Sequence, residues 1–136
     1  MTNTNDIGAL VLRLGLGVMY LAHAQLKILT FGLPGTAAFF AQVGFPAWTA
    51  YPVTLMEVAA GILLILGLHA RWVAVALIPI LLGAAWTHAG NGWLHTANGG
   101  GWEYPMFLVV ASAVQGLIGN GALALRMPRI AVPVRA

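Results

Sequence analysis

Residues 7–29 read IGALVLRLGLGVMYLAHAQLKIL, an apolar run interrupted by Arg13, Lys27 and a few uncharged polar side chains. An apolar run of about 20 residues is long enough to cross the roughly 30 Å hydrocarbon core of a bilayer as an α-helix. Residues 50–68, 71–88 and 102–125 form three further apolar runs of similar length. The sequence therefore predicts an all-α integral membrane protein whose single domain, residues 1–136, is a bundle of four transmembrane helices.

The composition excludes an ordinary water-soluble domain. Of the 136 residues, 60% are hydrophobic and only 7% are charged, whereas about a quarter of the residues are charged in soluble domains. The chain has no cysteine, which excludes disulfides, iron–sulfur clusters and cysteine-ligated zinc. Its six Lys and Arg residues are scattered rather than clustered, so binding of nucleic acid is not expected.

Two shorter segments connect the predicted spans. Residues 33–45 are apolar and aromatic but too short to cross a bilayer, and a glycine and a proline lie at each end of this segment. We expect a short helix here, between the first and second spans, that lies at the membrane interface or enters the bilayer as a re-entrant segment. Residues 89–101, rich in glycine and asparagine, are typical of a loop.

The positions of the positive residues predict the orientation in the membrane, because short cytoplasmic loops carry an excess of Lys and Arg. If the four spans alternate in direction, Arg71, Arg126, Arg129 and Arg135 fall on one side, whereas only Lys27 falls near the other. We therefore expect both termini in the cytoplasm, with residues 126–136 forming a cytoplasmic tail. The bilayer itself is the first expected partner.

Ionisable side chains gather at one depth of the predicted bundle. Charged side chains in the hydrocarbon cost about 2.5–3.5 kcal/mol each on insertion scales, so they usually face the bundle interior and mark functional sites. The ends of the first and third spans share the outer side with the starts of the second and fourth. This arrangement places five ionisable side chains in the outer half: His23, Lys27, Glu57, His88 and Glu103. The sequence thus predicts a buried polar cluster that opens towards the outer interface.

Arg13, Tyr20 and Lys27 fall on one stripe of the first span at helical spacing. Arg13 lies deeper than the other two, and we expect its long side chain to reach towards Glu57. Such a pair can also be purely structural, because buried ion pairs fix the register of helices. Lys27 and Glu103 lie near helix ends and can likewise extend to the interface without any further role.

Histidine ligation of a cofactor is a further alternative. His23 and His88 lie at comparable depth on different spans, so they are candidate axial ligands of a haem. The competing interpretation for His88 is a solvated side chain beside the loop. No His-Glu-x-x-His motif and no pair of His and carboxylate at helical spacing occurs, so no metal site is predicted.

Several motifs resemble those of DoxX family membrane proteins. Residues 13–17, RLGLG, and 21–27, LAHAQLK, resemble the family's opening, in which an arginine and small residues precede a His-Gly-x-x-Lys motif. Residues 57–68, EVAAGILLILGL, resemble its second-helix motif, and residues 119–125, GNGALAL, resemble its Gly-x-Gly ending. The chain departs from the family pattern at Ala24, where glycine is usual, and in the residues that close the ending.

The resemblance covers nearly the whole chain and implies a four-helix membrane bundle, usually bacterial, and hence a location in the inner membrane. Some relatives are subunits of thiosulfate:quinone oxidoreductases, others associate with redox-defence proteins, and many have no assigned activity. Our leading hypothesis is a membrane redox subunit that binds quinone or quinol, with a protein partner supplying electrons. The alternatives are a non-catalytic membrane anchor or assembly partner, and a small lipid-binding or transport protein. Self-association to a homo-oligomer is also left open.

Within the quinone hypothesis each polar residue has an expected role. Lys27 or His23 donates to a quinone oxygen, and Glu57 or His88 relays protons. The candidate catalytic residues are Glu57, Lys27 and His23. The candidate quinone-binding residues are Arg13, Tyr20, Trp86, His88 and Glu103, with Trp86 or Tyr20 stacking on the ring.

Overall fold

The computed structural model describes residues 3–125, and these residues form helices and turns with no β-strand. The helices are α1 Thr4–Gln25, α2 Leu33–Gln42, α3 Ala50–Leu66, α4 Ala70–His88 and α5 Glu103–Ile118; the shorter elements are a π-helical turn, Leu26–Thr30, and two 3₁₀ turns, Ala47–Thr49 and Ala89–Asn91. The predicted all-α class is confirmed for this part of the chain. The predicted cytoplasmic tail, residues 126–136, lies outside the described residues together with its three arginines.

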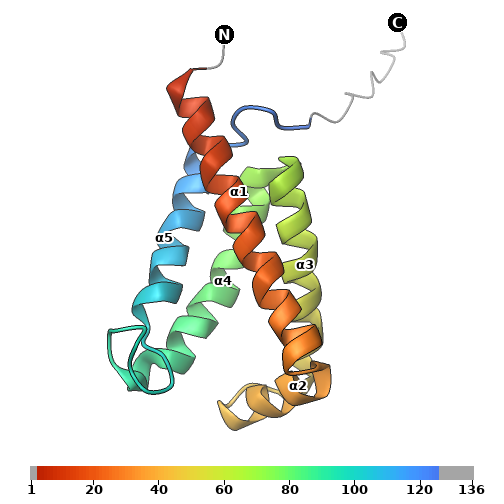
Figure 1. Cartoon of the computed structure of the whole chain (residues 1–136), viewed down its shortest axis with the longest axis vertical. Helices are drawn as coiled ribbons and strands as arrows, with labels where there is room; N and C mark the ends of the chain where they lie inside the picture. Colours follow the sequence, from red (N-terminus) through yellow and green to blue (C-terminus); the bar gives the residue numbers. More distant parts are fainter. Residues whose placement is uncertain (1–2, 126–136) are drawn as a thin grey trace, which may run out of the picture.

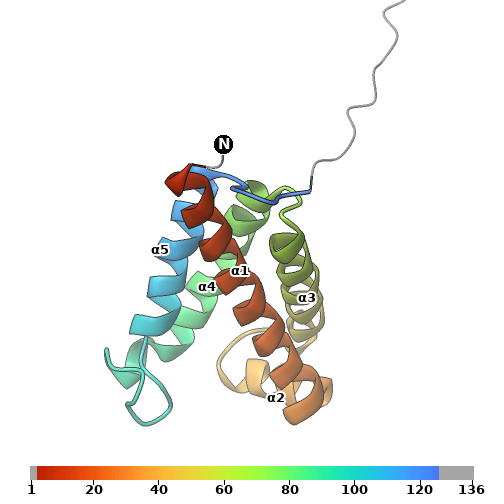
Figure 2. The same ribbon diagram turned by 45° about the horizontal axis from the view of Figure 1, so that its top comes forward.

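The helices other than α2 form two side-by-side pairs (Figure 1). Helix α1 lies against α3, and α4 lies against α5. The start of α1 and the segment that follows α5 lie at one end of the bundle, whereas α2 and the loop between α4 and α5 lie at the other. The two pairs are closest at the first end and diverge towards α2, as the rotated view also shows (Figure 2). We call the second end the α2 end.

Within residues 3–125, three helical stretches are long and apolar enough to cross a membrane: Thr4–Thr30, Ala47–Leu66 and Ala70–Asn91. Helix α5 is apolar but has only 16 residues, about 24 Å at about 1.5 Å per residue. Large hydrophobic side chains point outward, with exposed fractions of 64% for Val11, 69% for Leu55 and 68% for Phe107. Such a surface is consistent with contact with lipid, and the chain is accordingly a membrane protein.

Helix α5 ends at Ile118, although the apolar run predicts a helix up to residue 125. Gly119 and Gly121 have φ angles of +85° and +70°, a backbone conformation that glycine adopts far more readily than other residues. The chain then turns across the end of the bundle, where the Ala122 amide donates to the Asp6 carbonyl at 2.9 Å. The Gly-x-Gly ending is therefore a helix stop.

Helices α1 and α3 touch backbone to backbone where Gly17 faces Gly61. A Cβ atom added to either glycine would lie 2.9 Å from the carbonyl oxygen of the other. Small residues allow membrane helices to approach this closely. The contact sets the spacing of α1 and α3, and so of the side chains that both helices present at the α2 end.

Candidate functional site

A cavity of about 520 Å³ lies at the α2 end of the bundle. Its walls come from the end of α1, the π-helical turn, α2, the start of α3, the end of α4 and the start of α5. Most of the lining is apolar. Its polar and titratable members are Tyr20, His23, Lys27, Thr49, Glu57, Thr87, His88 and Tyr104. Pockets of roughly 300–1,000 Å³ with a few converging polar groups are typical of sites for small ligands.

Lys27 and Glu57 form an ion pair on the wall of this cavity. The ammonium nitrogen of Lys27 lies 2.7 Å from Oε1 and 2.6 Å from Oε2 of Glu57. The side chains are 18% and 7% exposed, so each charge is held in apolar surroundings mainly by the other. An ammonium has three N–H donors. Lys27 can therefore bind the carboxylate and still donate to a ligand.

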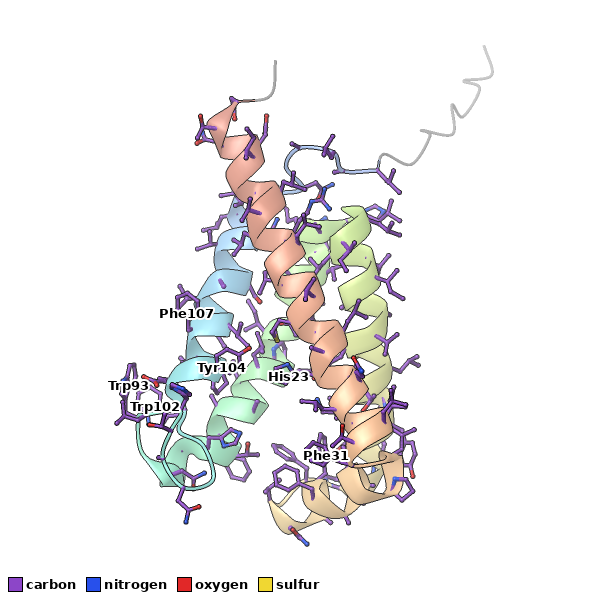
Figure 3. The ribbon with its side chains drawn as sticks, viewed as in Figure 1. His23, Phe31, Trp93, Trp102, Tyr104 and Phe107 are labelled. Atoms are coloured by element: carbon purple, nitrogen blue, oxygen red, sulfur yellow. The ribbon has the colours of Figure 1, made fainter. Side chains whose placement is uncertain are left out.

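His23 and His88 line the cavity in the same hydrogen-bonding state. Nδ1 of His23 lies 2.9 Å from the Met19 carbonyl oxygen, and Nδ1 of His88 lies 3.0 Å from that of Gly99. A carbonyl oxygen only accepts, so Nδ1 carries the hydrogen, and Nε2 of the neutral ring is an acceptor. His23 also stacks on Tyr104, with ring centroids 6.1 Å apart (Figure 3). In both neutral rings Nε2 is thus able to accept a hydrogen bond.

Tyr20 lies where the cavity meets the centre of the bundle. The residue is 1% exposed, and it lines the cavity. Its hydroxyl lies 3.4 Å from Oγ of Ser112 on α5, and Ser112 is fully buried. The hydroxyl pair satisfies two polar groups that would otherwise be unpaired in the apolar core.

Arg13 lies at the opposite end of the bundle, and its expected approach to Glu57 is wrong. Nη1 of Arg13 donates to the carbonyls of Leu64 and Ile65 at 2.9 and 2.6 Å, and Nη2 donates to the carbonyl of Ala122 at 2.8 Å. The last carbonyls of a helix have no donor within the helix. The guanidinium supplies donors at the end of α3 and also binds the segment that follows α5. Its role here is to join these two elements.

Trp86 and Glu103 are not part of the cavity lining in the described chain. Trp86 is 61% exposed and packs edge-on against Phe45, with ring centroids 5.4 Å apart, so it lies behind a lining ring. Oε1 of Glu103 accepts from the His95 amide at 2.8 Å and lies 2.9 Å from Nδ1 of His95. Glu103 therefore binds the loop between α4 and α5.

The aromatic wall of the cavity was not anticipated from the sequence. It consists of Phe31, Phe39, Phe40 and Phe45, which follow the π-helical turn or belong to α2 and its end. Figure 3 shows Phe31 near α2, on the far side of the cavity from Tyr104. The concentration of phenylalanine in one short apolar segment is the signal that could have identified it.

The arrangement of side chains gives little support for binding of a metal ion or a haem. Among residues 3–125, no group of three or more His, Asp or Glu side chains is placed to hold a metal ion. His23 and His88 both line the cavity, and ligating histidines commonly donate their second ring N–H to a carbonyl as these do. Haem ligation by this pair stays a prediction.

Comparison with known proteins gives a family and a relative. The sequence model of the DoxX family matches residues 8–90, a range that includes both members of the Lys27–Glu57 pair. A Bacillus subtilis (strain 168) protein named "Putative oxidoreductase CatD" is 32% identical over 125 residues, 92% of this chain and 89% of that protein. No solved structure matches the chain significantly. These findings confirm the family predicted from the motifs at residues 13–27 and 57–68.

Proposed function

Because the chain belongs to the DoxX family, we propose that it is a membrane redox subunit that binds a quinone or quinol in the cavity at the α2 end. The family and the oxidoreductase name of the relative support a redox-associated role in a membrane. The choice of quinone comes from the chemistry of the cavity.

The observation that carries the proposal is the position of the Lys27–Glu57 pair on the wall of a largely apolar, aromatic cavity. A quinone has a flat apolar ring with a hydrogen-bond acceptor at each carbonyl. Its site needs a slot for the ring and a donor at an oxygen. Phe39, Phe40 and Tyr20 offer the apolar surfaces, and the Lys27 ammonium offers the donor.

Reduction of a quinone to a quinol takes up two electrons and two protons, and oxidation releases them. Since a chain without cysteine holds no iron–sulfur cluster of its own, we assign the supply of electrons to a partner protein. Nε2 of His23 and of His88 can exchange protons with the ligand, because each is the acceptor nitrogen of a neutral ring. The Glu57 carboxylate relays protons along the same wall.

The proposed topology has four spans, with α5 as the fourth. The segment after Ile118 continues to the end of the bundle at which α1 begins, so the polypeptide covers more of the bilayer thickness than α5 does alone. Arg71 lies at the same end, where its Nη2 donates to the Leu117 carbonyl at 3.0 Å. By the positive-inside rule this end faces the cytoplasm of a bacterial inner membrane. Helix α2 then lies at the outer interface.

The test uses protein purified gently from its native membrane. We expect a bound quinone in the absorption spectrum and in mass spectrometry of the extracted small molecules. The Glu57→Gln variant should lose the quinone while it remains folded. Arg71→Gln, which removes an exposed charge at the opposite end of the bundle, is the matched control and should retain the quinone.

Other outcomes of this experiment identify the alternatives. A Soret band would identify haem and point to His23 and His88 as its ligands. Phospholipid as the only bound molecule in the wild-type protein would contradict the quinone proposal. It would favour a membrane anchor or a lipid-binding protein.

A further inference from the structure

Lys27 lies on the π-helical turn Leu26–Thr30, where the hydrogen bonding of α1 changes. In a regular α-helix the Phe31 amide would donate to the Lys27 carbonyl, four residues earlier. It donates instead to the Leu26 carbonyl, five residues earlier, at 2.9 Å. Single π-helical turns are rare in proteins, and those that occur often lie at functional sites. The Lys27 carbonyl therefore requires a donor from elsewhere in the fold.

Thr36 on α2 provides that donor. Its hydroxyl lies 3.1 Å from the Lys27 carbonyl oxygen and 3.0 Å from the Gly32 carbonyl oxygen. The hydroxyl has one hydrogen, which the two carbonyl oxygens share. Thr36 is only 4% exposed, so water competes little for this shared hydrogen. One buried hydroxyl thus connects α2 to the backbone of the residue whose ammonium pairs with Glu57.

We propose that Thr36 is a positioning residue, which holds the π-helical turn in the geometry that lets Lys27 reach Glu57. A return of this turn to regular α-helical bonding shifts the register by one residue, a rotation of about 100° around the helix axis. Such a rotation carries the side chains of the turn away from their present neighbours. The consequence for ligand binding rests on the proposed function, whereas the geometry of the ion pair does not.

Thr54 on α3 offers a matched comparison within the same chain. It is 3% exposed, and its hydroxyl donates to the Ala50 carbonyl, four residues earlier, at 2.7 Å. Thr36 makes the equivalent bond to Gly32 and adds the bond to Lys27. Valine has nearly the shape of threonine but no hydroxyl. Thr36→Val and Thr54→Val therefore both remove a local bond, and only Thr36→Val also removes the bond to Lys27.

The ion pair can be observed by solid-state NMR of the protein in lipid bilayers, because Lys27 is the only lysine and Glu57 is one of two glutamates. With nitrogen-15 at lysine Nζ and carbon-13 at glutamate Cδ, the dipolar coupling between the two nuclei reports their separation. The Glu57→Gln variant identifies the signal. We expect strong coupling in the wild type, in Thr36→Ser and in Thr54→Val, and its loss in Thr36→Val.

Two results would overturn the inference: wild-type coupling in Thr36→Val, or an equal loss of coupling in Thr54→Val. If Thr36→Val does not fold, Thr36→Cys takes its place, because a thiol is a much weaker donor than a hydroxyl. Reduced coupling is then expected, and unchanged coupling overturns the inference.

Quinone binding provides the second measurement. We expect Thr36→Val to weaken binding of a short-chain quinone by roughly five- to tenfold, as for the loss of one hydrogen bond, and Thr36→Ser to restore it. If the wild-type protein binds no quinone, the proposed function fails. The NMR coupling still decides whether Thr36 positions Lys27, so the two failures are distinguishable.

Discussion

Lys27 on the π-helical turn after α1 and Glu57 on α3 are joined by two contacts of 2.7 and 2.6 Å at the wall of the cavity. Helices α1 and α3 also touch where Gly17 faces Gly61. Such a pair can stabilise the fold, bind a ligand or do both. The two roles respond differently when one partner is removed and when both are replaced.

Lys27→Met should destabilise the protein by about 3–5 kcal/mol, because it leaves the buried Glu57 carboxylate without its partner. The double variant Lys27→Met/Glu57→Leu should regain most of this stability, since a buried ion pair can often be replaced by apolar side chains. The free energy of unfolding in mixed micelles of denaturing detergent measures both. Equal stability of the wild type and Lys27→Met would show that the ion pair does not contribute to the stability of the fold.

Arg13→Met should lower the free energy of unfolding by at least about 3 kcal/mol, because three hydrogen bonds from a charged donor to buried or partly buried carbonyls are lost. Ligand affinity of the folded fraction should not change, since Arg13 lies at the end opposite to the cavity. Unfolding and quinone titrations on the same preparation give both quantities. A loss of affinity with unchanged stability would contradict the assigned role.

Gly61→Ala should destabilise the bundle by about 1–3 kcal/mol through overpacking. The new Cβ would lie 2.7 Å from Cγ of Leu21 and 2.9 Å from the Gly17 carbonyl oxygen, which is backbone and cannot move aside easily. Gly15→Ala is the control, because a Cβ there meets no atom within 4 Å. Unfolding measurements that rank the two variants equally would argue against the close contact of α1 and α3.

His23→Phe keeps a flat ring against Tyr104 but removes the acceptor nitrogen Nε2. We expect quinol binding to weaken about three- to tenfold, as for one lost hydrogen bond. His95→Ala removes a histidine on the loop outside the cavity lining and should leave the affinity unchanged. Equilibrium titration with a short-chain quinol measures the affinity of both variants. An equal effect of the two substitutions would exclude a specific role for His23.

The fourth span can be tested directly, because the chain has no cysteine. Asn98→Cys and Asn120→Cys place single thiols at exposed positions, one before the start of α5 and one after its end. In intact spheroplasts an impermeant maleimide should label Asn98→Cys at once and Asn120→Cys only after permeabilisation. Labelling of both from outside would show that α5 does not cross the membrane.

From the sequence, depth in the bilayer groups His23, Lys27, Glu57, His88 and Glu103. The structure places the first four on one cavity, whereas Glu103 binds His95 in the loop between α4 and α5. Depth identifies the four neighbours because alternating helices fix which ends share a side. Depth does not reveal which carbonyls at a helix end lack donors, so it does not predict the partners of Arg13. That information becomes available only when the end of α3 and the segment after α5 are known in space.

Other differences come from local backbone geometry. Apolarity alone predicts a helix up to residue 125, but glycines with positive φ end α5 at Ile118. The π-helical turn that carries Lys27 leaves no clear mark in the sequence, since the donor to its Lys27 carbonyl is Thr36 on the next helix. The phenylalanines of the aromatic wall lie in one short part of the sequence, but the side of the bundle that they face depends on how α2 folds back.

The most direct test of the central claim is equilibrium binding of a short-chain quinone to the protein in lipid nanodiscs, compared with the double variant Lys27→Met/Glu57→Leu. The account predicts saturable binding to the wild type. In the folded double variant, which lacks the charged donor of the cavity, the affinity should be lower by about tenfold or more. Absence of saturable binding to the wild type, or equal affinity of the two proteins, would contradict a quinone site built on Lys27 and Glu57.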